Sequence, residues 1–297
     1  MWFLYTLMTF FCWGIADLFY KLGNKEEHSH IKTGVIVGLV MGIHAIIYLI
    51  VNKVSINFVD LLKYLPVSFF YIFSMVIGYK GLRYIELSIS SPIQNTSGVI
   101  SSILLVVFFK EVLNLPTIIS FVLIFVGILI LSLVEIHESK EERKKYKKNN
   151  TKRNFIFLLI LFPIFYSLLD GVGTFLDGVY LDKLELIDEN TALVAYEFTF
   201  LIYGIISYIY LKVKHVSFNL FREKEKISAA LFETAGQFFY VFAMSGNATV
   251  SCTVIGSYCI LSLILSRIFL KEKLSWKQYL AIFLVVIGIV ILSFLDL

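Results

Sequence analysis

Ten apolar runs, each about 20 residues long, dominate this sequence. A helix needs a run of that length to cross the hydrocarbon core of a bilayer. Backbone groups in lipid must bond internally, and runs this long can do so only as helices. The sequence therefore predicts an all-α integral membrane protein with ten transmembrane helices. The predicted spans lie at 2–20, 33–51, 64–82, 88–108, 116–134, 154–173, 191–211, 227–245, 248–270 and 276–295.

The composition supports a membrane protein. Hydrophobic residues make up 58% of the 297 residues and charged residues 16%, and the mean hydropathy is +0.82. A soluble domain would carry about a quarter charged residues, so a chain that buries one aqueous core is excluded. The three cysteines, Cys12, Cys252 and Cys259, lie inside apolar runs. They predict neither a disulfide framework nor a metal site.

Basic residues are distributed unevenly between the loops. The longest polar stretch, EIHESKEERKKYKKNNTKR at 135–153, contains eight Lys or Arg residues. If this stretch is cytoplasmic, alternation of the spans puts 22 of the 26 basic residues on the same side. The positive-inside rule then predicts a multi-pass protein of the plasma membrane with both chain termini outside.

The chain contains an internal repeat. FFKEVLNLPTIISFVLIFVGILILSL at 108–133 aligns with FLKEKLSWKQYLAIFLVVIGIVILSF at 269–294, and Asp17 aligns with Asp170. Each half holds an odd number of spans, five, so the second half must be inverted. Inverted repeats are typical of secondary transporters, whose substrate site lies near the midplane. The predicted units are a first five-helix repeat at 1–134, a basic cytoplasmic linker at 135–153 and a second five-helix repeat at 154–297.

Two motifs resemble a known family. They are CWGIADLFYK at 12–21 and SSPIQNTSGVISSILLVVFFKEVLNLPTIISFVLIFVGILILS at 90–132, with a second copy of the latter at 251–294. The chain resembles EamA-type members of the drug/metabolite transporter superfamily over essentially its whole length. The resemblance implies a helical basket around a central cavity that works by alternating access. It also implies that the first, third, fourth, sixth, eighth and ninth spans line this cavity.

Two aligned acids lie inside spans, where ionisable residues usually mark functional sites. Asp17 lies about 24 Å into its helix, near the cytoplasmic face, with Lys21 one turn later. Asp170 is equally deep in an inverted span, near the outer face, so about 15 Å of depth separates the two acids. We expect gating or proton-coupling acids at opposite mouths rather than one binding pair. For Asp17, the alternative is an edge pair in which Lys21 snorkels.

The eighth span carries a polar stripe. Glu233, Gln237 and Tyr240 follow i, i+4 and i+7, which puts them on one helix face. Unpaired polar groups near midspan cost several kcal/mol, so the stripe must face protein or a wet cavity. We expect the stripe to bind substrate, or to exchange a proton against it, because burial disfavours a charged carboxylate. The alternative for Glu233 is a structural carboxyl bonded to neighbouring helices.

Further candidates lie in the fourth, seventh and ninth spans. Glu197 is about a third of the way into its span, where it either lines the cavity or braces the eighth span. Pro92 frees a backbone carbonyl, and Gln94 and Asn95 beside it are expected to bond a substrate. The alternative for this small-residue stretch is close helix packing. Tyr258 is close to midspan and is expected to be a cavity aromatic.

Trp13 and Tyr166 are repeat partners, one turn before the two aligned acids. Aromatic faces attract desolvated cations, and aromatic cages recognise quaternary ammonium groups. The pair is therefore a candidate part of a cation site. The alternative is a packing or interfacial role, which is the default for aromatics in membrane proteins.

Motifs for other chemistries are absent from the sequence. It contains no Walker motif, GxSxG, HExxH or CxxC, and His28 and His30 have no further ligand nearby. These absences predict no cofactor, no metal and no ATP-driven mechanism. No basic run with interleaved aromatics indicates nucleic-acid binding. We therefore expect no enzyme activity and no nucleic-acid partner.

These features together predict a secondary transporter of a small organic metabolite that works by alternating access. A midplane acid with aromatics favours a cationic or amine-bearing substrate, and a neutral or zwitterionic amino acid is the alternative. Alternatives of other classes are a membrane-embedded enzyme acting on lipid-linked groups and a non-transporting scaffold. The expected partners are the small-molecule substrate and the lipid bilayer. The resemblance implies a monomer, which the two fused halves permit, and a dimer is the alternative.

Overall fold

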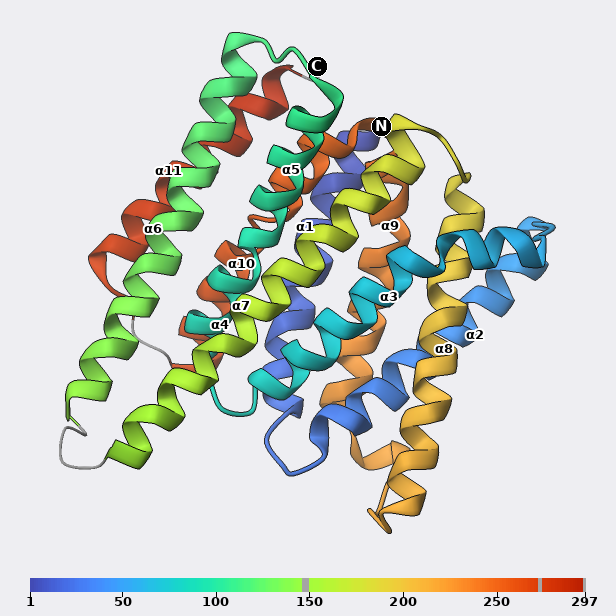
Figure 1. Ribbon diagram of the computed structural model, residues 1–297, viewed down its shortest axis with the longest axis horizontal. Coiled ribbons are helices and arrows are strands. Elements are labelled where there is room, and N and C mark those ends of the chain that lie inside the picture. The colour runs from blue at the N-terminus through green and yellow to red at the C-terminus, as the bar shows by residue number, and fades with distance from the viewer. Residues whose placement is uncertain (146–149, 272–273, 296–297) are drawn as a thin grey trace.

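The computed structural model describes residues 1–145, 150–271 and 274–295, and these residues form helices and loops without strands (Figure 1). The first half of the chain supplies α1 (Trp2–Gly23), α2 (Ser29–Asn52), α3 (Phe58–Gly81), α4 (Leu87–Gln94), α5 (Thr96–Phe109) and α6 (Leu115–Lys145). The second half supplies α7 (Asn150–Gly178), η1 (Val179–Lys183), α8 (Glu189–Val213), η2 (Leu220–Arg222), α9 (Lys224–Ile255), α10 (Cys259–Leu265), η3 (Ser266–Leu270) and α11 (Trp276–Leu295).

The helices are those of a multi-pass membrane protein. In the described chain, seven helices are long and apolar enough to cross a bilayer, and Cys259–Leu270 and Trp276–Leu292 are shorter apolar helices. The stretch expected as a linker, 135–153, is helical at both of its ends, because α6 runs to Lys145 and α7 begins at Asn150. Residues 146–149 of that stretch lie outside the described residues.

The predicted fourth span is broken in two. Pro92 lies in α4 and has no backbone N–H to give to the preceding turn, and the helix ends two residues later at Gln94. Asn95 separates α4 from α5 and donates its side-chain amide to the Ser91 carbonyl at 2.9 Å. The Pro92 carbonyl accepts a hydrogen bond from Ser132 of α6 at 3.1 Å. The break is therefore held by side chains of its own segment and of α6.

A second break divides α9 at Asn247, which has non-helical backbone angles of φ −166° and ψ 90°. The Asn247 side chain accepts from the Val250 amide at 3.0 Å and so caps the second part of α9. Ser251 donates to the Ala243 carbonyl at 2.9 Å. Residues eight apart in a straight helix would be about 12 Å apart, so the chain folds back at Asn247. This turn falls between the predicted spans 227–245 and 248–270.

Four helix pairs make the most extensive contacts in the bundle: α1 with α9, α2 with α8, α6 with α11, and α3 with α7. Glycines allow the closest approaches. A Cβ added to Gly38 of α2 would lie 2.8 Å from the Gly204 Cα of α8, and one added to Gly98 of α5 would lie 2.8 Å from the Gly256 Cα. Backbones that approach this closely leave no room for a side chain, as is common between transmembrane helices.

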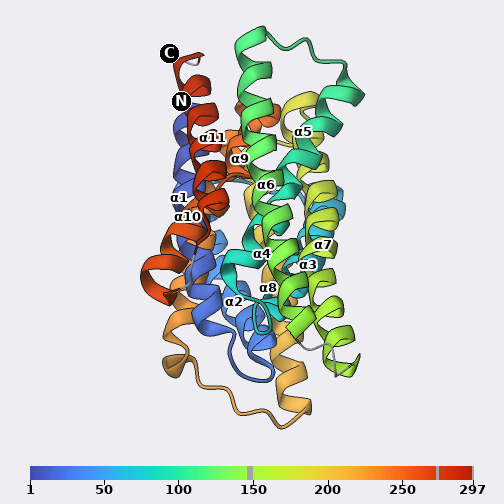
Figure 2. The ribbon, with the colours of Figure 1, turned by 90° about the vertical axis from the view of Figure 1, so that its left-hand side faces the viewer.

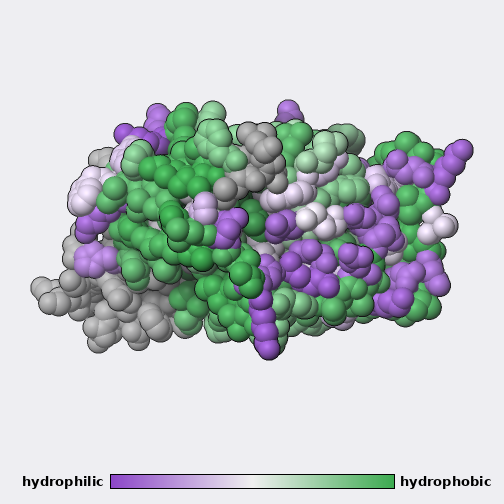
Figure 3. Space-filling view, turned by 90° about the horizontal axis from the view of Figure 1, so that it is seen from above, coloured by the Kyte–Doolittle hydropathy of each residue, from purple (hydrophilic) through white to green (hydrophobic). Residues whose placement is uncertain are grey.

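The lipid-facing surface is apolar. Large exposed side chains on its outer faces include Phe11, Ile47, Phe73, Ile206 and Phe283. The N-terminus and the last turns of α11 lie at the same end of the bundle (Figures 1 and 2). Seen from that end, hydrophobic residues cover much of the flank, and hydrophilic residues gather over parts of the end itself (Figure 3). We call this end the terminal end and the other the loop end.

Candidate functional site

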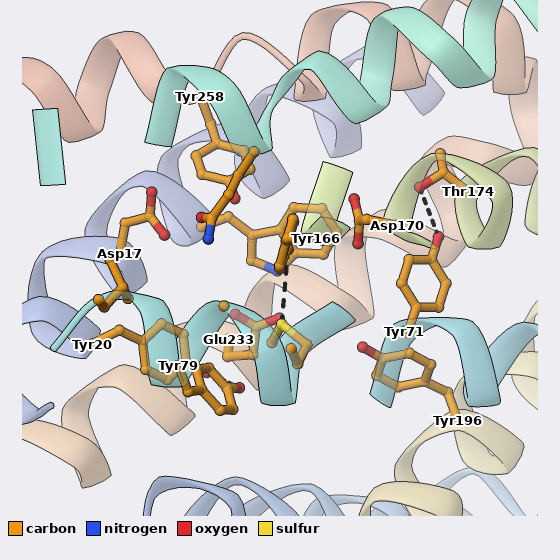
Figure 4. Close-up of a pocket in the computed structure, with 15 residues that line it drawn as sticks. Asp17, Tyr20, Tyr71, Tyr79, Tyr166, Asp170, Thr174, Tyr196, Glu233 and Tyr258 are labelled. Atoms are coloured by element: carbon orange, nitrogen blue, oxygen red, sulfur yellow. Dashed lines mark hydrogen bonds between the residues drawn. The ribbon is translucent and has the colours of Figure 1, made fainter. Parts of the chain in front are cut away.

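A central cavity lies among α1, α3, α4, α7, α8 and α9, and Figure 4 shows the side chains that line it. Its lining residues are Trp13, Asp17, Tyr20, Tyr71, Met75, Gly78, Tyr79, Leu82, Gln94, Tyr166, Asp170, Thr174, Tyr196, Glu233 and Tyr258. These residues come from the six spans that are expected to line the cavity, and Tyr196 comes in addition from the seventh span.

The cavity is narrow in this conformation. The volume open to the centres of water molecules is about 50 Å³. At about 10–15 Å³ for each water on this measure, the space holds only about three to five waters. The conformation is therefore close to occluded, and a metabolite with several heavy atoms would need the walls to move.

Asp17 is held by two serines from different parts of the chain. Ser91 of α4 and Ser262 of α10 both donate to its Oδ2, at 2.6 Å and 2.8 Å. The residue is 7% exposed. Hydrogen bonds from two hydroxyls partly replace the water that a buried carboxyl loses. Asp17 therefore has a fixed position at one side of the cavity.

Asp170 faces the same cavity from the opposite side, with Glu233 between the two aspartates (Figure 4). Ser74 of α3 donates to its Oδ1 at 3.3 Å. The expectation that Asp17 and Asp170 lie at opposite mouths is therefore wrong for this structure. The predicted span ended at residue 173, whereas the helical segment continues through Gly178 and η1 to Lys183. Asp170 is thus about 20 Å from the end of its helix.

Glu233 reaches the cavity from α9, as the polar stripe predicts. It is 6% exposed, and its charge interacts with those of both Asp17 and Asp170. Tyr20 lies beside its carboxyl. None of the fifteen described lining residues is Lys, Arg or His. Three carboxyl groups therefore share one cavity without a basic residue in its described wall.

Seven of the fifteen lining residues are aromatic, and Trp13, Tyr166 and Tyr258 among them are predicted site residues. The Trp13 ring lies 6.0 Å from the Tyr258 ring in an edge arrangement. The Nε1 of Trp13 and the Nε2 of Gln94 are buried and have no hydrogen-bond partner in the described structure. The cavity wall therefore combines acids, aromatic faces and two buried N–H donors without a partner in the described structure.

Three predicted binding residues do not line the cavity. Gln237 is 1% exposed and its Nε2 has no partner in the described part of the chain. Tyr240 lies behind the wall, with its ring 5.0 Å from that of Trp13. The Asn95 side chain is hydrogen-bonded to the Ser91 carbonyl at the break between α4 and α5. The helical spacing correctly predicted that the stripe is buried, but only Glu233 reaches the open space.

Glu197 also lies outside the cavity lining. Its two carboxyl oxygens are 2.7 Å and 2.9 Å from the His44 Nδ1 of α2. The Glu197 side chain is fully buried, while His44 is one-third exposed. The His44 ring contacts Phe238 of α9 at 6.2 Å. Glu197 therefore links α8 to α2, and a role in gating or proton coupling stays a prediction.

Sequence reasoning missed four tyrosines of the wall: Tyr20, Tyr71, Tyr79 and Tyr196. The signal in α3 was available, because Tyr64, Tyr71, Met75 and Tyr79 follow spacings of seven, four and four residues. Such spacings place side chains on one helix face. Tyrosine is also common at membrane interfaces, so its presence alone does not indicate a cavity.

A polar network closes the terminal end. Lys183 of η1 lies 2.8 Å from Glu111 and 2.6 Å from Asp182. The hydroxyl of Thr249 donates to Glu111 at 2.7 Å, and the Ala248 amide donates to Asp182 at 2.9 Å. Both acids thus meet the start of the second part of α9, where the helix dipole favours negative charge. The network joins the loop after α5 to η1 and α9.

Other contacts close the loop end. Lys21 at the end of α1 donates to the Leu82 carbonyl at 2.8 Å and also to the Ile85 carbonyl. Glu223, just before α9, lies 3.2 Å from Lys32 of α2 and also pairs with Lys226. Burial raises the pKa of Glu223, but the hydrogen bonds and charges of Lys226 and Lys32 outweigh it and hold the pKa below its usual value. The pair with α2 therefore involves an ionised carboxylate at neutral pH.

The described residues include no group of three His, Cys, Asp or Glu side chains that could hold a metal ion. The arrangement can bind a small polar or charged molecule, and it offers no activated nucleophile in the described wall. The cavity therefore has the features of a ligand-binding site inside a membrane protein, closed at both ends by the contacts described above.

Comparisons with known proteins agree with this geometry. The family model of the EamA-like transporter family matches residues 1–133 and 190–294. No curated protein matches the sequence. A solved structure whose title reads "Crystal structure of protein" has the same fold, with a TM-score of 0.69 and 11% identity over 99% of this chain and 96% of that chain. The chain therefore belongs to the EamA-like transporter family, whose members are membrane transporters of the drug/metabolite transporter superfamily.

Proposed function

We propose that this protein is a secondary transporter that moves a small cationic or amine-bearing metabolite across the plasma membrane by alternating access. One observation carries the proposal. The cavity brings together the carboxyl groups of Asp17, Asp170 and Glu233, with no basic residue in its described wall. Charges in a low-dielectric site need an opposite charge or a proton. A cationic substrate, or protons exchanged against it, supplies what the wall lacks.

The aromatic wall supports the same substrate class. Tyrosine and tryptophan faces attract a desolvated cation by about 2 kcal/mol. Six tyrosines and Trp13 surround the three carboxyl groups (Figure 4). A substrate cation would therefore meet both a carboxylate and several ring faces within one small space.

The packing supports an arrangement of ten spans as two inverted five-helix repeats. Under the repeat, α1 corresponds to α7 and α3 to the first part of α9. Swapping the two repeats turns the contact between α1 and α9 into the contact between α3 and α7. The contacts α2–α8 and α6–α11 each join two helices that correspond under the repeat, so the swap leaves them unchanged. The close approaches Gly38–Gly204 and Gly98–Gly256 each join two segments that correspond to one another under the repeat. Rocking of one half against the other about these crossings is the motion we propose.

Orientation and assembly are part of the proposal. The charge bias supports a cytoplasmic loop end, with Lys21, Lys32 and Lys226, and both termini outside. The cavity is built within one chain, so a monomer suffices for transport. The linker between the halves is cytoplasmic in this arrangement.

A specific observation favours a second candidate, a zwitterionic amino acid. The buried N–H groups of Trp13 and Gln94 have no partner in the described structure, and unsatisfied buried donors cost about 1–3 kcal/mol each. A substrate carboxylate could accept from both while its ammonium group meets Glu233.

Thermal unfolding of the purified protein tests the proposal. The probes are choline and ethanolamine as cations, phenylalanine and leucine as zwitterions, and glucose 6-phosphate as an anion, each at one pH below and one above neutrality. A ligand at 100 times its dissociation constant stabilises by about 2.7 kcal/mol. We expect stabilisation by a cationic probe that is greater at the higher pH, because protons compete for the carboxylates.

Two variants decide the site. Glu233→Gln should abolish the stabilisation, whereas Glu225→Gln, the same change at an exposed position of α9, should retain it. Stabilisation by zwitterions alone would favour the second candidate. Stabilisation only by the anion, unchanged in Glu233→Gln, would contradict both. Uptake of the stabilising probe into proteoliposomes then separates a transporter from a scaffold, and conversion of a lipid-linked donor would indicate an enzyme.

A further inference from the structure

A further buried acid, Asp177, lies outside the cavity lining. It follows Asp170 by seven residues on α7 and is fully buried. Its Oδ1 accepts a hydrogen bond from the Tyr64 hydroxyl of α3 at 2.6 Å. Its Oδ2 is buried without a hydrogen-bond partner in the described structure. An ionised carboxylate here would leave one oxygen unsatisfied, which is costly.

The groups that face Asp177 are hydroxyls rather than bases. Tyr64 of α3 donates to its carboxyl, and the hydroxyls of Tyr71 of α3 and Tyr240 of α9 lie nearby. Tyr196 of α8 lies behind Tyr71, with ring centroids 5.6 Å apart. On its own segment the neighbouring titratable groups are Asp170, Tyr180, and the Asp182–Lys183 pair that joins Glu111. From α5, the contact at the adjacent Gly178 is the apolar Leu105.

A row of hydrogen-bonded hydroxyls near Asp177 reaches the cavity wall. Tyr71 donates to Thr174 Oγ1 at 3.1 Å, and the Tyr71 and Tyr240 hydroxyls are 2.6 Å apart. A tyrosine hydroxyl has a single proton to donate. If Tyr71 gives its proton to Thr174, Tyr240 must give its own to Tyr71. The Tyr240 oxygen is then free only to accept.

This donor order matches a protonated Asp177. A protonated Oδ2 is uncharged, which lowers the cost of burying it without a partner in the described structure. Loss of that proton reverses the order: Tyr240 would donate to Asp177, Tyr71 to Tyr240, and Thr174 to Tyr71. Thr174 lines the cavity, so the state of Asp177 would set which hydrogen bonds the cavity wall can offer.

The row also crosses between the two halves of the chain. Tyr64 and Tyr71 belong to α3 in the first half, and Asp177 and Tyr240 to α7 and α9 in the second. The contact between α3 and α7 is one of the most extensive in the bundle. A change in hydrogen bonding at this contact acts where one half would rock against the other.

We propose that Asp177 is a proton-binding site that couples proton movement to the conformation of the cavity. The coupling part rests on the proposed transport function. One O–H bond forms on Oδ2 when a proton arrives from bulk water, and the same bond breaks when the proton returns to bulk water on the other side. No other bond changes, and the hydroxyl row only reverses its donor order.

Infrared difference spectroscopy between acidic and alkaline pH tests proton binding directly. Wild type should show a carboxylic-acid C=O band that is present at acidic pH and absent at alkaline pH. Asp177→Asn should lose this band. Asp60→Asn, the same change at a one-third-exposed acid of α3 that pairs with Lys63, should keep it. Tyr240→Phe should keep the band and shift its frequency, because the neighbouring hydroxyl is gone.

Proteoliposomes with an entrapped pH-sensitive dye test the coupling, with choline, ethanolamine and phenylalanine as probes. In Asp177→Asn, proton movement with the probe should fall to the level of empty vesicles, while exchange of labelled for unlabelled probe continues. Asp177→Glu keeps a carboxyl group and controls for folding, since its band should move rather than vanish.

The outcomes separate the two proposals. If wild type moves none of the probes, the transport proposal fails for these substrates, and the infrared result still decides proton binding. If wild type and Asp177→Asn both move protons with a probe, transport stands and coupling through Asp177 is overturned. If the same bands titrate in Asp177→Asn as in wild type, the proposal that Asp177 binds a proton is overturned.

Discussion

Replacing Glu223 by Gln should destabilise the loop end, because this one carboxylate serves two buried lysines. Lys32 is 8% exposed and Lys226 is 5% exposed, and both pair with Glu223. Lys32 has one further acidic contact, Glu26 at 3.8 Å. Glutamine keeps the size of the side chain and removes only its charge. Glu223 precedes α9 without a side-chain cap bond, so no helix cap is lost.

The expected cost follows from burial. Removing one partner of a buried ion pair costs about 3–5 kcal/mol, since a buried charge is left uncompensated. Glu26→Gln provides the matched control, because it removes the other acid near Lys32. The Glu26 side chain is 79% exposed, and such exposed pairs contribute about 0–1 kcal/mol. The two variants should therefore differ by at least about 2 kcal/mol.

The assay is thermal unfolding in detergent, followed by tryptophan fluorescence across a range of pH. The pKa of Glu223 lies below its usual value, so its stabilisation is complete above the unfolded pKa of about 4.3 and is lost as the pH falls through the lower folded pKa. The gap between wild type and Glu223→Gln should be full at neutral pH and should close only in acid. Equal stability of the Glu223→Gln and Glu26→Gln variants would refute the reasoning.

Two further predictions concern packing and capping. Gly98→Ala should lower the free energy of unfolding by about 1–3 kcal/mol, because a Cβ there would lie 2.5 Å from the Cys252 carbonyl oxygen. The matched Gly173→Ala should cost less in the same denaturation assay, because the nearest atom to its Cβ is a Phe70 side-chain carbon at 3.2 Å. Asp188→Ala should lower the free energy of unfolding by about 0.5–2 kcal/mol, because the Asp188 side chain accepts from the backbone amides of the first turn of α8. Hydrogen exchange in that first turn should accelerate, and unchanged exchange would contradict the capping role.

The sequence predicted part of the candidate site for a clear reason. Glu233 is an acid near the middle of an apolar helix, and the cost of burying it forces it toward protein or water. The same argument applies to Asp17 and Asp170. It did not apply to Asp177, which lies in the stretch FYSLLDGVGTFLDG with Asp170 seven residues earlier on the same face. The predicted span ended before residue 177, so Asp177 was not recognised as an intramembrane acid.

Tyrosines show where sequence reasoning ends. In α8, Tyr196 is 2% exposed and lines the cavity, whereas Tyr208 and Tyr210 of the same helix are exposed. An aromatic ring with one hydroxyl suits a core, a membrane interface or a wet cavity about equally well. Helical spacing tells which tyrosines share a face, but not what that face meets.

By itself, the sequence determined that this chain spans the membrane many times as helices and carries acids inside them, because apolar length and the cost of bare backbone in lipid leave no other choice. Tertiary structure alone decided that Asp17, Asp170 and Glu233 share one cavity and that hydroxyls surround Asp177. The face of a helix on which a residue lies is a local property that spacing gives directly, whereas its depth also depends on where the helix ends. Which helices meet, and where their polar faces converge, depends on crossings such as Gly98–Gly256, which form only when segments far apart in the chain pack together.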